Sequence, residues 1–136
     1  MTMKPRIAIV VPARDEAESI PHVLADIPSA YSPRIVVVDN GSNDGTGEVA
    51  QRLGAEVVLE QQPGYGIACQ AGLRHLAAEP PDIAVILDAD HSDYPQDLDA
   101  LLQPILDGDA DLVCGSRVHL AEPGALGAHV RWGNGL

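Results

Sequence analysis

The chain has 136 residues, of which 46 % are hydrophobic and 21 % charged, and its formal net charge is −12 at pH 7. This length fits one domain over residues 1–136, and this composition argues against a disordered chain. The 8 basic residues form no cluster, which argues against nucleic acid as a partner. An acidic protein that binds a diphosphate needs a cation as mediator.

The apolar segments of the sequence also indicate where the protein resides. No segment approaches the roughly 18 apolar residues of a membrane span, and the first residues do not resemble a signal peptide. We therefore expect a cytoplasmic protein. Cys69 and Cys114 stand in apolar surroundings without CxxC spacing, which predicts two buried, reduced thiols.

Apolar runs typical of strands alternate with segments of helical periodicity. In chain order the sequence predicts a strand at 6–11, a helix at 20–27, a strand at 34–38, a helix at about 46–53, a strand at 56–59, a helix at 67–78, a strand at 82–87, a helix from Pro95, and a strand at 111–114.

This alternation predicts an α/β fold, a three-layer α/β/α sandwich around a mainly parallel sheet. In such sheets ligands bind beyond the carboxyl ends of the strands. The polar clusters of this chain each follow a predicted strand, so they should converge on one edge: Pro12-Ala13-Arg14, Asp39, Asp88–Asp90 and Arg117.

Asp88 and Asp90 are the strongest candidates for metal ligands. In extended backbone, residues two apart point the same way, so both carboxylates can face one ion. Hard oxygen ligands favour Mg²⁺ or Mn²⁺, which also take phosphate oxygens and water. The alternative is a pair of solvated carboxylates in a turn.

The other polar clusters have both functional and structural interpretations. Asp39 could accept a hydrogen bond from a ribose hydroxyl or a base N–H, and Arg117 could clamp a phosphate. For residues 40 and 42–44 the sequence favours turn formation, with Asp44 capping the next helix. Residues 64–66 could bring backbone N–H groups against phosphate, although a plain turn is the better interpretation.

Taken together, these clusters resemble the family 2 glycosyltransferases. The resemblance rests on residues 11–16, Val38 to Thr46, Leu87 to Asp90 and 115–117, and their order is most similar to the dolichyl- or polyprenyl-phosphate sugar synthase branch. It implies a GT-A (Rossmann-like) fold, a UDP- or GDP-linked sugar donor, Mg²⁺ or Mn²⁺, and inversion at the anomeric carbon. It also implies a membrane-associated acceptor such as a polyprenyl phosphate, which would bring the protein to the inner face of the membrane.

The resemblance assigns roles to individual residues. Asp88 and Asp90 match the family's metal motif, Arg117 its arginine near the donor phosphates, and Arg131 an arginine that faces the acceptor phosphate. Asp90 and Arg117 would then be the catalytic pair that stabilises the departing diphosphate. The residues matching the nucleotide-binding positions are Pro12, Ala13, Arg14, Glu16 and Asp39.

The chain also departs from the family pattern. Asp15 replaces the usual Asn of the first loop, and Ser92 stands where a third metal ligand, commonly Gln, is found. The family continues past the position of Leu136 into acceptor-binding elements. We therefore expect either a fragment truncated at its C-terminus or a nucleotide-sugar-binding module that is inactive alone. A haloacid-dehalogenase-like phosphatase is a third interpretation, although its Asp-x-Asp would lie near the start of the chain. The sequence does not indicate an oligomeric state.

Overall fold

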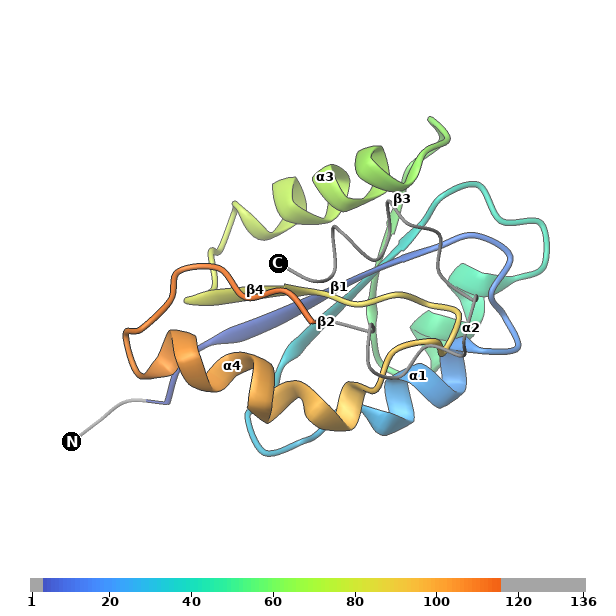
Figure 1. The fold of residues 1–136 in the computed structure, drawn as a ribbon. Helices are drawn as coiled ribbons and strands as arrows, with labels where there is room; N and C mark the ends of the chain where they lie inside the picture. Colours follow the sequence, from blue (N-terminus) through green and yellow to red (C-terminus); the bar gives the residue numbers. More distant parts are fainter. Residues whose placement is uncertain (1–3, 116–136) are drawn as a thin grey trace, which may run out of the picture. The chain divides into compact units, whose positions relative to one another are not determined.

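Four strands pair in parallel, in the order β3-β2-β1-β4, to form one sheet (Figure 1). They are β1 (Ile7–Ala13), β2 (Arg34–Asp39), β3 (Glu56–Leu59) and β4 (Ile83–Ile86). The computed structural model describes residues 4–115. The chain divides into two compact units, residues 1–96 and 97–136, and the sheet belongs to the first. The prediction of one functional domain over 1–136 stays a prediction.

The central strand β1 is buried along its whole length and runs two residues further than predicted. Pro12, where we expected the strand to end, pairs with Val38 of β2. The neighbouring Ala13 accepts a hydrogen bond from the Asn40 amide on the β2 side. Because bonding sides alternate along a parallel strand, the missing N–H of Pro12 faces β4, whose ladder ends at Ile86. A proline is therefore tolerated in this central strand.

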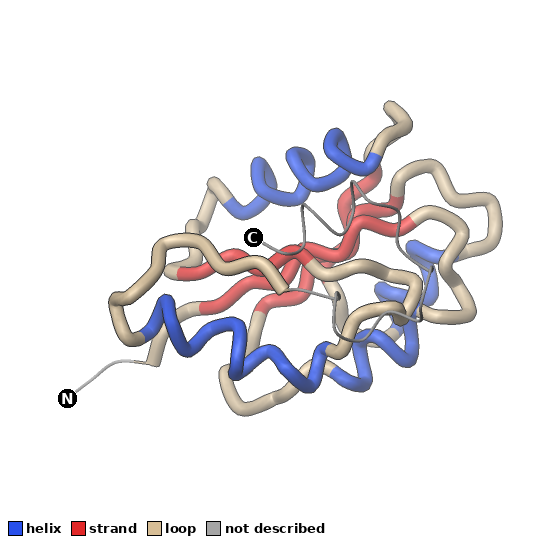
Figure 2. The backbone as a smooth tube through the Cα atoms, viewed as in Figure 1, coloured by secondary structure: helices blue, strands red, loops and turns tan. Residues whose placement is uncertain are grey.

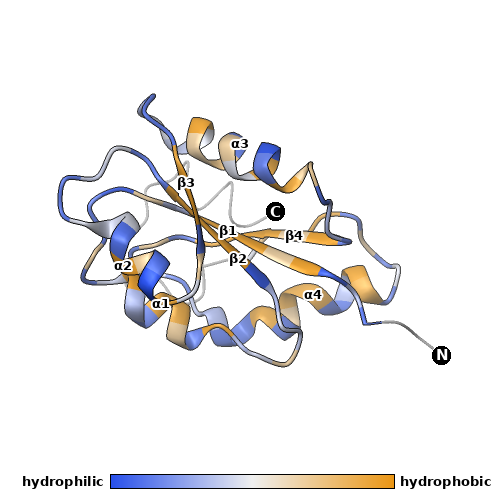
Figure 3. Ribbon diagram, turned by 180° about the vertical axis from the view of Figure 1, so that it is seen from behind, coloured by the Kyte–Doolittle hydropathy of each residue, from blue (hydrophilic) through white to orange (hydrophobic). Residues whose placement is uncertain are grey.

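Helices cover both faces of the sheet, as Figure 1 shows. The α3 helix (Tyr65–Leu76) lies on one face, and α1 (Ile20–Asp26) and α2 (Thr46–Arg52) lie on the other. The strands are largely hydrophobic, whereas the helices carry both hydrophobic and polar residues (Figure 3). The predicted three-layer α/β/α arrangement is therefore confirmed for the first unit.

The core between α3 and the sheet is built from small residues. Ala68, Ala71 and Gly72 of the helix pack over Val10 and Val38 of the strands. A Cβ atom added to Gly72 would overlap Cγ1 of Val10 and lie 3.1 Å from Cγ2 of Val38. The close approach of α3 to the sheet therefore depends on the absence of a side chain at position 72.

The helical segment expected from Pro95 is confirmed: it begins with a 3₁₀ turn (Pro95–Asp97), and α4 follows at Leu98–Leu106. The strand predicted at 111–114 is wrong, because these residues have no strand conformation in the structure. Leu112 is 81 % exposed, so this apolar run has no strand partner within residues 4–115.

The burial of the cysteines and the character of the helices can be compared with the sequence predictions. Cys69 is buried as predicted, but Cys114 is exposed, because the strand expected to bury it does not form. None of the helices between residues 4 and 115 has the length and apolar character needed to cross a membrane.

The Gly72→Ala variant should be destabilised by about 1–3 kcal/mol, because the new methyl group overpacks the interface between α3 and the sheet. Gly66→Ala, on the same helix, is the matched control, since a Cβ there meets nothing within 4 Å. Alanine is the better helix former, so this control should be neutral or more stable. Urea unfolding of both variants gives the comparison, and equal stability of the two would contradict the packing argument.

An ion-pair network on the surface predicts an acid-dependent contribution to stability. Glu56 of β3 contacts Arg34 at 2.8 Å and His75 at 3.0 Å. Hydrogen bonds from Arg34 and then from His75 lower the pKa of Glu56 to about 2. A carboxyl group whose pKa falls on folding stabilises the protein above its unfolded pKa, near 4.5, and loses this contribution as pH falls toward 2.

Replacing Glu56 by Gln should therefore reduce the free energy of unfolding at pH 7 by a modest amount, because the paired side chains are partly exposed. The difference from wild type should shrink between about pH 4.5 and pH 2. Urea unfolding at a series of pH values measures it. A difference that stays constant throughout this range would be inconsistent with the assigned network.

Candidate functional site

The loops that follow β1, β2 and β4 lie at the same end of the sheet (Figure 2). This placement follows from parallel pairing, because parallel strands present their carboxyl ends to one edge. The predicted convergence of polar clusters is therefore confirmed for those within residues 4–115. Seven carboxylates lie on the loops after these three strands, and Asp39 is the last residue of β2; the seven are Asp15, Glu16, Glu18, Asp44, Asp88, Asp90 and Asp93.

The loop after β1 is fastened to the loop after β2 by side chains of both. The amide of Asp15 donates to Oγ of Ser42 at 2.9 Å, and the Asp15 carboxylate accepts from the amide of Asn43 at 2.7 Å. The amide of Glu16 donates to Oγ1 of Thr46 at 3.0 Å. The conformation that presents Arg14 and Glu16 is therefore fixed by β2–α2 residues, and Arg14 itself is exposed.

Asp44 joins both loops and accepts a hydrogen bond from the first amide of α2, whose N-cap residue is Gly45 rather than the predicted Asp44. Its Oδ1 accepts from the amide of Thr46 at 3.1 Å and from the Thr46 hydroxyl, while Oδ2 accepts from the amide of Ala17 at 3.0 Å. The hydrogen bond with the Thr46 hydroxyl, followed by that with the Ala17 amide, holds the pKa of the Asp44 carboxyl below its usual value. This carboxylate therefore has a structural role.

Asp39 is the last residue of β2 and is largely buried. It is 9 % exposed, and its Oδ1 accepts from the amide of Ser42 at 2.9 Å. A Cβ on Gly47 would lie 2.7 Å from Asp39 Oδ2, so glycine at position 47 makes room for this carboxylate. The surrounding backbone thus fixes Asp39 at the strand end, where the family resemblance requires a nucleoside-binding carboxylate.

Asn40 has a role that the sequence did not reveal. We predicted a turn-former, but its side chain is buried and makes three hydrogen bonds to the β3–α3 connection. Its Nδ2 donates to the carbonyls of Glu60 and Gln62, and its Oδ1 accepts from the amide of Gly64, at 2.8–3.0 Å. Asn40 therefore fixes the approach to the first turn of α3.

The acidic turn, which we define as residues 88–91, differs from the predicted extended geometry. Ala89 and Asp90 lie in a turn rather than in extended backbone, and His91 has a φ of +62°. Strand alternation therefore does not set the directions of the Asp88 and Asp90 carboxylates. Asp88 is half-buried and Asp90 is exposed. The amide of Ser92 donates to Oδ1 of Asp90 at 3.0 Å.

Tyr65, the first residue of α3, reaches the acidic turn and was missed at the sequence level. Its hydroxyl donates to Oδ1 of Asp88 at 3.0 Å. Partial burial, together with the contact to Asp88, raises the pKa of Tyr65, so the hydroxyl keeps its proton at neutral pH. The only signal in the sequence was its place between Gly64 and Gly66, which indicates a turn and does not reveal the partner.

The described carboxylates have the chemistry that Mg²⁺ or Mn²⁺ requires. Asp88 and Asp90 supply hard oxygen atoms, and Asp93 accepts a hydrogen bond from the amide of Asp88 at 3.0 Å. Within residues 4–115, no three His, Cys, Asp or Glu side chains are grouped to hold an ion. That is compatible with ions of this class, which one or two carboxylates bind together with phosphate and water.

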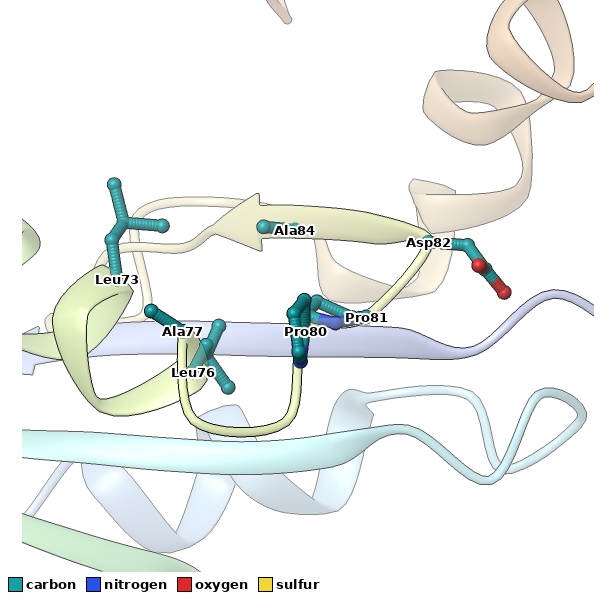
Figure 4. Close-up of a pocket in the computed structure, with 7 residues that line it drawn as sticks. All are labelled: Leu73, Leu76, Ala77, Pro80, Pro81, Asp82 and Ala84. Carbon is teal, nitrogen blue, oxygen red and sulfur yellow. The ribbon is translucent and has the colours of Figure 1, made fainter.

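Two predicted site residues, Arg117 and Arg131, lie outside the described residues. A surface hollow occurs away from the acidic turn (Figure 4). It is lined by Leu73, Leu76 and Ala84, among others, and by Asp82, which precedes β4. This hollow lies at the amino end of β4, opposite to the candidate site, so we do not assign it to the donor.

Comparison with known proteins identifies relatives of this arrangement. The sequence model of the family described as glycosyl transferase family 2 matches residues 8–132. An uncharacterized glycosyltransferase of Mycobacterium tuberculosis is 48 % identical over 126 residues, covering 93 % of this chain and 53 % of the relative. The undecaprenyl-phosphate mannosyltransferase of Micrococcus luteus is 37 % identical over 119 residues, covering 82 % and 48 %. The chain thus spans about half the length of these curated relatives.

Solved structures show the same fold. Glucosyl-3-phosphoglycerate synthase from Mycobacterium tuberculosis, in complex with Mn²⁺, UDP-glucose and phosphoglyceric acid, superposes with a TM-score of 0.64 at 32 % identity. The match covers 77 % of this chain and 40 % of that protein. The predicted α/β fold of the GT-A type is thereby confirmed.

The Gly47→Ala variant should displace the Asp39 carboxylate, because the added methyl group would lie within 2.7 Å of its Oδ2. The Ser42 amide then loses its acceptor, and its hydrogen exchange should accelerate several-fold. Asp39→Asn keeps an oxygen acceptor of the same shape and should leave this exchange slow. NMR-detected exchange measures both, and an unchanged Ser42 amide in Gly47→Ala would refute the steric argument.

Proposed function

The chain belongs to glycosyl transferase family 2, and on this premise we propose that it binds a nucleotide-activated sugar as the donor-binding part of an inverting, metal-dependent glycosyltransferase. The observation that carries this proposal is the placement of Asp39 and Asp88 at the carboxyl ends of β2 and β4. These strands flank β1 in one parallel sheet, where α/β proteins bind nucleotides.

The acidic character of this edge determines how a diphosphate could bind. Carboxylates repel phosphate, so direct contact is unfavourable without a cation between them. Mg²⁺ or Mn²⁺ held by Asp88 and Asp90 would supply that charge and stabilise the departing nucleoside diphosphate. The Mn²⁺ and UDP-glucose in the solved structure described above support this class of donor and ion.

The nucleoside side of the site is assigned to the loops after β1 and β2. Pro12 and Ala13 are buried at the end of β1, and Arg14 and Glu16 follow them on the β1–α1 loop. Asp39, fixed by the Ser42 amide, is the proposed acceptor for a ribose hydroxyl or base N–H. We further propose that Asp90 and Arg117 stabilise charge on the leaving group.

The acceptor is proposed by chemical class. A polyprenyl phosphate is already ionised near neutral pH and needs no general base, and the Micrococcus luteus relative is named for undecaprenyl phosphate. Arg131 would face the acceptor phosphate, at the cytoplasmic face of the membrane. The second candidate is a nucleotide-sugar-binding module without transfer activity of its own. The family assignment argues against the phosphatase interpretation.

Isothermal titration with UDP- and GDP-sugars, with and without Mn²⁺, tests donor binding. We expect Mn²⁺-dependent binding of one donor class, weakened about 10-fold or more in Asp88→Asn and Asp90→Asn, a loss typical of a damaged metal site. Asp39→Asn should weaken nucleotide binding both with and without the metal. Asp82→Asn, at the opposite end of β4, is the matched carboxylate control.

Absence of Mn²⁺-dependent binding of any nucleotide would contradict the proposal. A turnover assay with an undecaprenyl-phosphate acceptor, run beside the titration, separates the two candidates. Binding accompanied by transfer supports a transferase, whereas binding without transfer supports the module.

A further inference from the structure

The acidic turn is attached to α1 at two points, one on either side of Asp90. Before it, the carbonyl of Ala89 accepts a hydrogen bond from Oγ of Ser19 at 2.6 Å, and Ser19 directly precedes α1. After it, Nε2 of His91 lies 2.6 Å from Oδ2 of Asp26, the last residue of α1. Both neighbours of the proposed metal ligand are therefore held by the same helix.

The His91 ring is held from a second direction as well. It stacks on the ring of His22, with centroids 5.7 Å apart and an interplanar angle of 29°. His22 and Asp26 are four residues apart on α1, so they lie on one side of the helix. Together the carboxylate and the ring fix both the position and the plane of the His91 imidazole.

This contact accompanies an unusual backbone conformation. His91 has a φ of +62°, a left-handed conformation that costs a residue with a side chain roughly 1–2 kcal/mol. Glycine would adopt it freely, but glycine has no ring to reach Asp26 or His22. His91 thus adopts the backbone conformation that the turn needs and also attaches the turn to α1 through its side chain.

We propose that Asp26 and His22, acting through His91, are positioning residues for the carboxylate of Asp90. This inference rests on the proposed function, since it concerns the ion that Asp90 would hold. Neither residue needs to touch the donor. With Ala89 and His91 both tethered, the backbone of Asp90 has little freedom, and an ion meets a carboxylate already in place. Partners behind a ligand typically contribute about 10–100-fold to metal affinity.

The test compares Mn²⁺ affinity with metal-free nucleotide affinity at one fixed pH. Free Mn²⁺ is followed by EPR in the presence of UDP or GDP, whichever the wild-type chain binds. Asp26→Ala and His91→Asn should each weaken Mn²⁺ binding about 10-fold and leave metal-free nucleotide affinity unchanged. Asparagine tolerates a positive φ but is too short to reach Asp26, so it removes the attachment while preserving the turn.

Two further variants separate positioning from general damage. Asp26→Asn keeps an oxygen acceptor for His91 and should restore most of the Mn²⁺ affinity. The double variant Asp26→Ala/His91→Asn should bind Mn²⁺ no more weakly than His91→Asn alone, because both substitutions break the same contact. Asp82→Ala, which removes the exposed ion pair with Arg6, is the control and should bind Mn²⁺ as wild type does.

The outcomes distinguish this inference from the proposed function. If the wild-type chain shows no Mn²⁺-dependent nucleotide binding, the proposed function fails and this inference fails with it. If wild type binds Mn²⁺ and both Asp26→Ala and His91→Asn bind it equally well, only the positioning role is overturned. Loss of metal-free and metal-dependent binding in equal measure, with a lower melting temperature, would likewise overturn it in favour of a purely structural contact.

Discussion

The buried strand β1 pairs in parallel with β2 on one side and with β4 on the other. The rest of the structure depends on this constraint. Because all four strands run the same way, every connection returns across the sheet, and the loops after β1, β2 and β4 begin at one edge. The strand cores are aliphatic and uniform, with Val36, Val37 and Val38 fully buried in β2. The chemically distinctive residues are thereby confined to the loops.

Hydrogen bonds join those loops to one another. Asp15, Asp44 and Asn40 each join two connections through backbone amides or carbonyls. Such contacts fix the geometry of the loops without requiring additional apolar side chains. Two of these three residues are carboxylates, so the same residue type serves both loop architecture and the proposed cation site at this edge.

Much of the fold follows from the sequence alone, because short apolar runs such as those of β1 and β2 leave a clear signal. The third strand has the predicted bounds at Glu56–Leu59, and α2 begins at Thr46 as expected. The strand predicted at 111–114 does not form: apolar residues favour a strand only where a partner is present, and within residues 4–115 this segment pairs with no strand and Leu112 is exposed. Periodicity does not identify pairing partners, so it also misplaced Cys114.

The candidate site could be predicted in residue type but less well in geometry. Asp39, Asp88 and Asp90 were identified as candidates because they stand at or just after the ends of the apolar runs that predict β2 and β4. The contacts that orient them were not found, because they join residues far apart in the chain, such as Tyr65 with Asp88 and His91 with Asp26. Residues 89–90 form a turn rather than the extended backbone we assumed. The sequence Asp-Ala-Asp is compatible with both conformations, so it did not indicate which one forms.

The three hydrogen bonds of Asn40 have a consequence for the thermodynamics of ligand binding. The connection from Glu60 to Gly64 contains a glycine and a proline and would sample many conformations if it were unattached. Each backbone residue fixed costs about 1–2 kcal/mol of conformational entropy. Because Asn40 holds this segment in the folded chain, that cost is met on folding. A ligand at this edge of the sheet therefore meets a surface whose ordering entropy has already been lost.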